Sequence, residues 1–140
     1  MAFLLCSLPR RVRRFVSLSV LWMAVSLAPA RAGADYQRSI KPLLKQRCFS
    51  CHGALKQKGG LRLDTVELMR KGGESGPALL PGDPARSLIL EKVSETDEAE
   101  LMPPKHEGER FNAAQLAQLR EWISSGAPGI AGEKAEPSPR

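Results

Sequence analysis

The chain has 140 residues, the size of one ordinary domain, with 21 lysines and arginines against 15 acidic residues and a formal net charge of +6. Five arginines fall in residues 1–32, which hold no acidic residue, so the rest of the chain is nearly neutral and gives no support to nucleic-acid binding. Aromatic residues make up only 5% of the chain, which also disfavours a surface for stacking bases.

Residues 1–32 resemble a secretory signal peptide. Four arginines precede a short apolar run, residues 15–30, and Ala30 and Ala32 supply small residues at the cleavage positions. The run is shorter than the roughly 20 apolar residues that a transmembrane helix needs. We therefore expect export to the periplasm or another extracytoplasmic space, with membrane attachment only through an uncleaved signal segment.

Residues 33–127 predict a small all-α domain. A first helix is expected over residues 34–47, because Asp35 can cap it and its apolar residues recur at helical spacing. Pro42 interrupts that pattern and predicts a kink or a late start. Between glycine-rich turns, residues 65–70 predict a short helix.

The second half of the domain predicts two further helices. Asp83 and Pro84 can open the first of them, whose apolar face lies within residues 88–93. Residues 112–125 give the clearest pattern, because Asn112 and Gln115 match a capping box. No segment alternates strongly enough to demand a sheet. Residues 128–140 are polar and contain proline, so they are expected to form a disordered tail.

The strongest functional signal is the run from Cys48 to His52, Cys-Phe-Ser-Cys-His, which matches the attachment sequence of c-type haem. Positions i, i+3 and i+4 share one face of a helix. Both thiols can therefore add to the vinyl groups on one porphyrin edge, while the imidazole reaches the iron. The sequence predicts one covalently attached haem c on Cys48 and Cys51, with His52 as a ligand of the iron.

Three other uses of the two cysteines remain open. A disulfide between Cys48 and Cys51 could form after export. A zinc site would need two further ligands, and beyond His52 only His106 is at hand. A thioredoxin-like redox pair expects a βαβ context, which the pattern does not show.

A second axial ligand has to come from elsewhere in the chain, and Met102 is favoured. It lies far enough from His52 to reach the opposite haem face, and the following proline favours extended geometry at Met102. The alternatives are His106, Met69 and an iron left open on that side. Met69 is better explained by packing on a short helix.

Other residues are expected to support these ligands. The carbonyl oxygen of Pro77 is a candidate acceptor for the second ring nitrogen of His52. Trp122 and Tyr36 are expected to pack between the terminal helices or against haem, with a hydrogen bond from Trp122 to a haem propionate as an alternative.

Taken together and in chain order, several motifs between about Asp35 and Ala127 resemble those of the planctomycete-type cytochrome c domain, a relative of class I cytochromes c. The matching pieces are CFSCHG at 48–53, KGGLRLD at 58–64, GGESGP at 72–77, PGDP at 81–84, MPP at 102–104 and LREWI at 119–123. The resemblance implies a cytochrome c fold in which His52 is the proximal and Met102 the distal ligand. Such domains often begin long exported proteins, so the chain is expected to be a free-standing carrier or a shortened form.

Ligation by His52 and Met102 would fill both axial positions, and a soft thioether favours Fe(II). The sequence therefore predicts an electron carrier that exchanges single electrons with redox partner proteins, and not a catalyst. Two alternatives remain: an open-haem enzyme or a gas or redox sensor, and an interaction module stapled by a disulfide and free of haem.

Overall fold

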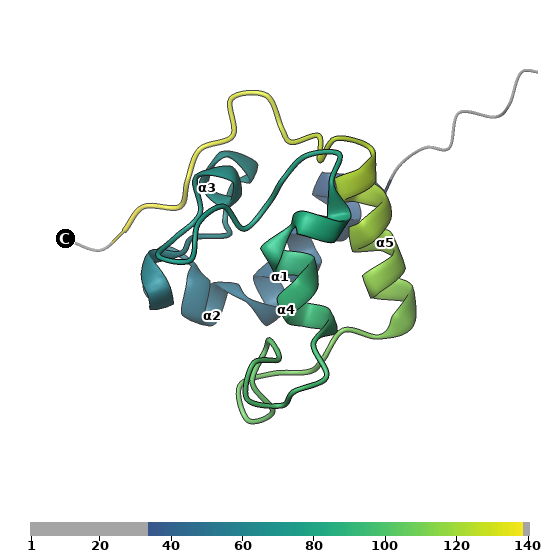
Figure 1. Ribbon diagram of the computed structural model, residues 1–140. Coiled ribbons are helices and arrows are strands. Elements are labelled where there is room, and N and C mark those ends of the chain that lie inside the picture. The colour runs from purple at the N-terminus through teal and green to yellow at the C-terminus, as the bar shows by residue number, and fades with distance from the viewer. Residues whose placement is uncertain (1–33, 139–140) are drawn as a thin grey trace, which may run out of the picture. The chain divides into compact units, whose positions relative to one another are not determined.

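The structure is a computed structural model that describes residues 34–138, so the predicted signal segment, residues 1–32, lies outside the described residues. The described chain forms α1 (Lys41–Arg47), α2 (Phe49–His52), α3 (Val66–Lys71), α4 (Leu88–Ser94) and α5 (Ala113–Ser124) (Figure 1). A π-helical turn, Tyr36–Ile40, precedes α1, and 3-10 turns cover Lys58–Gly60 and Pro84–Arg86. These residues contain no strand, which confirms the predicted all-α fold. None of the described helices has the length and apolar character to cross a bilayer.

The first helical segment changes type where the sequence predicts a disturbance. The Asp35 side chain accepts a hydrogen bond from the Arg38 backbone N–H at 3.0 Å, as expected of a cap. Pro42 lies in the first turn of α1, where its missing N–H would have no helical partner. The chain before it winds as a π-helical turn, so the expected kink or late start takes the form of a change in helix type.

The cap of α5 agrees with the sequence prediction, whereas α4 begins later than expected. Thr65 caps α3, and Asn112 and Gln115 form the predicted capping box of α5, with hydrogen bonds of 2.9 and 3.0 Å. Asp83 caps only the short turn Pro84–Arg86. Helix α4 starts after Ser87, whose extended backbone separates it from this turn.

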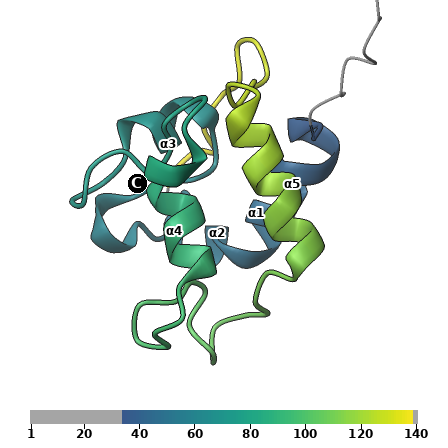
Figure 2. The same ribbon diagram turned by 45° about the vertical axis from the view of Figure 1, so that its right-hand side comes forward.

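Apolar residues from all five helices form one core. Helix α4 packs against α5, and α5 packs against the N-terminal turn (Figures 1 and 2). Trp122 is fully buried and stacks on Tyr36 with 5.4 Å between ring centroids. The Trp122 indole N–H donates to the Pro128 carbonyl oxygen at 3.0 Å. Both aromatic residues thus take the packing role between the terminal helices.

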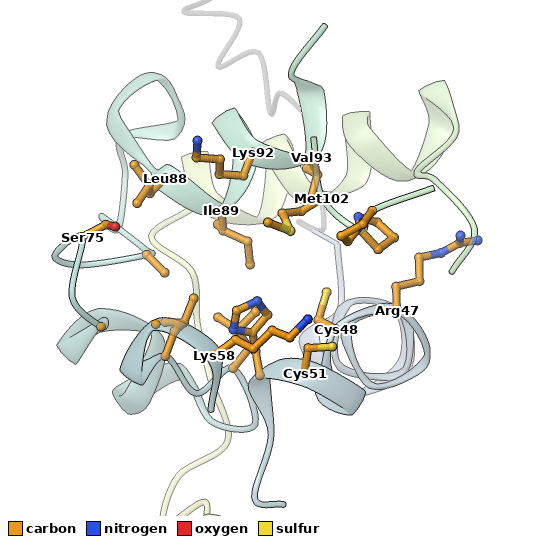
Figure 3. Close-up of a pocket in the computed structure, with 18 of the residues that line it drawn as sticks. Arg47, Cys48, Cys51, Lys58, Ser75, Leu88, Ile89, Lys92, Val93 and Met102 are labelled. Carbon is orange, nitrogen blue, oxygen red and sulfur yellow. The ribbon is translucent and has the colours of Figure 1, made fainter. Parts of the chain in front are cut away.

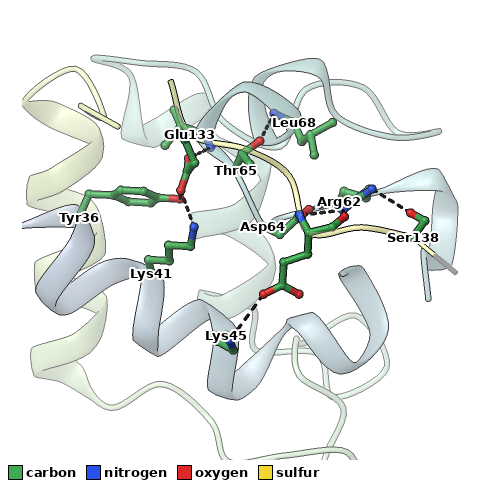
Figure 4. Close-up of polar contacts among 11 residues, drawn as sticks. Tyr36, Lys41, Lys45, Arg62, Asp64, Thr65, Leu68, Glu133 and Ser138 are labelled. Carbon is green, nitrogen blue, oxygen red and sulfur yellow. Dashed lines mark hydrogen bonds and ion pairs between the residues drawn. The ribbon is translucent and has the colours of Figure 1, made fainter. Parts of the chain in front are cut away.

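The C-terminal segment, residues 128–138, differs from the expected disordered tail, because it is fastened to the domain by hydrogen bonds (Figure 4). The Glu133 carboxylate, 8% exposed, accepts from the Tyr36 hydroxyl at 3.1 Å, Lys41 Nζ at 2.6 Å and the Val66 N–H at 3.2 Å. Its polar composition correctly indicates that the segment has no apolar face of its own. Composition could not show that the Glu133 carboxylate accepts hydrogen bonds from the body of the domain.

A second anchor of this segment involves Asp64, which is fully buried. Arg62 donates to both Asp64 oxygens, at 2.9 and 2.6 Å, and the Glu136 N–H donates at 2.8 Å. Burial opposes ionisation of Asp64, but Arg62 and the Glu136 N–H outweigh it, so the pKa of this carboxyl lies below its usual value. The ionised form is therefore part of the folded state at neutral pH.

Replacing Glu133 by Ala is expected to lower the free energy of unfolding by about 2 kcal/mol, because three donors, one of them charged, lose a shared acceptor. Urea unfolding of the full chain measures this change. The matched control is Glu121→Ala on the exposed face of α5, expected to stay within about 0.5 kcal/mol of the unaltered chain. Equal effects of the two substitutions would show that Glu133 does not anchor the tail.

Asp64→Asn is expected to change how stability depends on pH. A carboxyl whose folded pKa is lowered stabilises the fold above its unfolded pKa, and this contribution is lost as the pH falls below about 4. The variant should be less stable at pH 7 and should lose less stability between pH 6 and pH 3. Urea midpoints across this range test it, with the exposed Glu67→Gln as control. An unchanged acid dependence in Asp64→Asn would refute the assignment.

Candidate functional site

A cavity of about 300 Å³ with mainly apolar walls lies between the Cys48–His52 turn and α4 (Figure 3). Cys48, Cys51 and His52 line one side, and Ile89, Val93 and Met102 line the other. Figure 3 shows the sulfur atoms of Cys48 and Cys51 on one wall and that of Met102 across the open space. The structure thus brings together the three residue types that the sequence singled out.

The backbone between α1 and α2 sets the positions of the two cysteines and the histidine. The Cys51 and His52 N–H groups both donate to the Cys48 carbonyl oxygen, at 3.1 and 2.8 Å, so these residues share one helical turn. The turn ends at Gly53, where a Cβ atom would come within 2.4 Å of the Phe49 carbonyl oxygen. The two thiols and the imidazole therefore face the same side, as the spacing predicts.

Both cysteines are free thiols in the described chain. Burial raises the pKa of the Cys48 thiol to about 12, while neighbouring Arg47 lowers it only in part. A redox-active cysteine pair instead depends on a thiol with a lowered pKa. The chemistry of Cys48 thus gives no support to the thioredoxin-like alternative.

The surroundings of His52 favour the uncharged form of its imidazole. Burial lowers the pKa of its ring, and the backbone carbonyl groups of Lys58 and Leu61 act in the opposite direction but are weaker. A neutral imidazole is the form that binds a metal ion. Its Nδ1 atom is buried and, among the described residues, has no hydrogen-bond partner. The structure therefore shows no bond to the Pro77 carbonyl oxygen, and the role of Pro77 as acceptor stays a prediction.

Among the candidates for the second axial position, only Met102 lines the cavity. Its backbone N–H donates to the Lys92 carbonyl oxygen at 2.8 Å, which ties the residue to α4. Met69 is fully buried in the core, and His106 is exposed on the loop that follows Met102. Neither residue belongs to the cavity wall.

Sequence reasoning missed two features of the cavity wall. Arg47, directly before Cys48, lines the cavity. A charged residue at the end of an amphipathic helix does not by itself indicate a place in a cavity wall. The glycine pairs were predicted only as turns, yet Gly73 and Gly59 bring two turns into backbone contact. A Cβ on Gly73 would lie 2.3 Å from the Gly59 carbonyl oxygen, and the Glu74 N–H donates to that oxygen at 2.8 Å. Only glycine fits such an approach.

The residues around the cavity fit a covalently bound haem. Two thiols on one helical face, an imidazole with an unpaired ring nitrogen and a thioether on the opposite wall supply the expected bonds. Within residues 34–138, no group of three or more His, Cys, Asp or Glu side chains is placed to hold a metal ion. The zinc alternative thus has no ligand set in the described part of the chain.

Comparison with known proteins agrees with this geometry. The family model described as Planctomycete cytochrome C matches residues 48–106, which include the cysteine motif and Met102. No curated protein and no solved structure matches the chain. Residues 48–106 therefore correspond to a planctomycete-type cytochrome c domain, and this match suggests a haem-binding electron carrier with covalently bound haem and its iron.

Proposed function

We propose that the protein is an exported cytochrome c with a single haem, which carries one electron at a time between partner proteins. The observation that carries this proposal is that one mainly apolar cavity is lined by the two thiols and His52 on one side and by the Met102 thioether on the other. The chain holds one Cys-x-x-Cys-His sequence, which supports one haem.

Each residue of the site has a separate task in this proposal. Cys48 and Cys51 would hold the haem through thioether bonds, which would prevent its dissociation. His52, kept neutral by burial, would supply one ligand to the iron. Met102, on the opposite wall of the cavity, would supply the other, and its soft sulfur would favour the reduced state. The bound haem supplies a reversible one-electron couple.

The architecture favours a carrier over a catalyst. A residue suited to bind iron lines each side of the cavity, so a small molecule such as oxygen would have to displace Met102. The rest of the wall is mainly apolar, which limits water around the bound group and its ligands. The signal-like residues 1–32 support export, and thioether attachment of haem is an extracytoplasmic process.

The exported protein is expected to carry exactly one haem mass when it is made in cells that have a cytochrome c maturation system. Mass spectrometry of the secreted product and a haem stain after denaturing electrophoresis measure this. The Cys48→Ser, Cys51→Ser double variant should lose the stain, because no thioether bond can form. Ser50→Ala, between the two cysteines, is the control and should keep it. A secreted product of bare polypeptide mass would contradict the proposal and favour the disulfide-stapled module.

Replacing Met102 by Ala is expected to open one axial position. The reduced protein should then bind carbon monoxide rapidly, the ferric spectrum should change from low spin to high spin, and the reduction potential should fall by on the order of 0.1 V. Met69→Leu is the control, because Met69 is buried in the core and does not line the cavity. If the unaltered protein already binds carbon monoxide as fast as Met102→Ala, the open-haem alternative is correct.

A further inference from the structure

Arg47 is a buried charge that the proposed ligand set does not explain. It is the last residue of α1, lies directly before Cys48 and lines the cavity, and its side chain is only 7% exposed. Arginine is rarely buried to this degree unless its donors are paired. Figure 3 shows its guanidinium turned away from the two cysteine sulfur atoms. Its partners therefore lie elsewhere.

The guanidinium binds the main chain of a distant segment, residues 109–111. Nη1 donates to the carbonyl oxygen of Glu109 and, at 2.9 Å, to that of Arg110. Its central carbon lies 5.6 Å from the centroid of the Phe111 ring. Nη2 also donates to the Glu109 carboxylate at 3.1 Å, but that side chain is 82% exposed, so this ion pair contributes little. The backbone and ring contacts carry the interaction.

The segment held by Arg47 belongs to the same connection as Met102. Residues 95–112 connect α4 to α5 without a helix; its second part, residues 102–112, is called the Met102 loop, and residues 105–110 of it are exposed. The Met102 N–H fastens the start of the Met102 loop to the Lys92 carbonyl oxygen. Arg47 fastens its end to α1, next to the turn that holds the two cysteines. The loop is thus pinned at both ends across the cavity.

We propose that Arg47 is a positioning residue that latches the Met102 loop onto α1 and so keeps the thioether over the cavity. This inference rests on the proposed role of Met102 as axial ligand. Burying Arg47 costs free energy of folding, because its Nε atom is buried and has no hydrogen-bond partner among the described residues. A lysine could supply the charge but not the planar fork that spans two carbonyl oxygens and lies over a ring.

The latch predicts a local effect on Met102 that differs from a general loss of stability. Opening of the loop would expose the iron to an added ligand, whereas the stacked pair Trp122 and Tyr36 takes part in none of the contacts of Arg47 described above. Variants of Arg47 should therefore speed displacement of Met102 by more than their unfolding free energy accounts for. A variant that weakens only the core should not.

Stopped-flow binding of carbon monoxide to the reduced, haem-loaded protein tests the latch. Arg47→Lys and Arg47→Met are both expected to bind carbon monoxide about tenfold faster than the unaltered protein, since charge-assisted hydrogen bonds close the loop. Glu109→Gln keeps the backbone carbonyl groups and should stay within about twofold. Ile123→Val weakens the core away from the cavity and should also stay within about twofold.

Each outcome decides the matter. Fast binding in both Arg47 variants, with slow binding in both controls, supports the latch. An unaltered rate in Arg47→Lys overturns it, and so does an equal increase in Ile123→Val, which would reveal general destabilisation. If Arg47→Met yields no haem-loaded protein, Arg47→Lys decides alone. Failure of the proposed function shows separately, because the unaltered protein would then lack haem or bind carbon monoxide rapidly itself.

Discussion

The single helical turn from Cys48 to His52 is the constraint on which the site depends. Its two backbone hydrogen bonds to the Cys48 carbonyl oxygen place both thiols and the imidazole on one face, which is the arrangement that the proposed attachment of haem requires. The glycine after His52 then lets the backbone leave the turn at close range to Phe49. The arrangement of the proposed haem-attachment residues therefore depends on only six consecutive residues, 48–53.

The opposite wall of the cavity has a different origin. Met102 lies on a loop without regular structure, whose position comes from contacts outside the loop: with Lys92 of the preceding helix at one end and with Arg47, distant in the sequence, at the other. Such contacts are weaker individually and depend on the whole fold. In the proposed function, the stability of the Met102 loop would therefore affect both ligand exchange at the iron and the reduction potential.

The outcome of sequence reasoning follows this division between local and remote causes. Caps at Asp35 and Asn112, the disturbance at Pro42 and the turn of cysteines all arise from neighbours in the chain, and the structure agrees with them. The anchored segment 128–138 and the buried Arg47 arise from partners more than 60 residues away, which composition and periodicity cannot reveal. The late start of α4 has a nearby cause that the pattern of apolar residues does not show: the hydroxyl of Ser87 bonds to the backbone of Leu80 and Asp83 across the preceding turn.

The proposed cytochrome c, with haem held by thioether bonds and Met102 as its distal ligand, gives a role to Cys48, Cys51, His52 and Met102 together. The most direct measurement of this account is X-ray absorption at the iron edge of the oxidised and the reduced exported protein. The account predicts one sulfur neighbour among the atoms bound to iron in both states, with nitrogen atoms making up the rest. A ligand shell made only of nitrogen and oxygen atoms would contradict it.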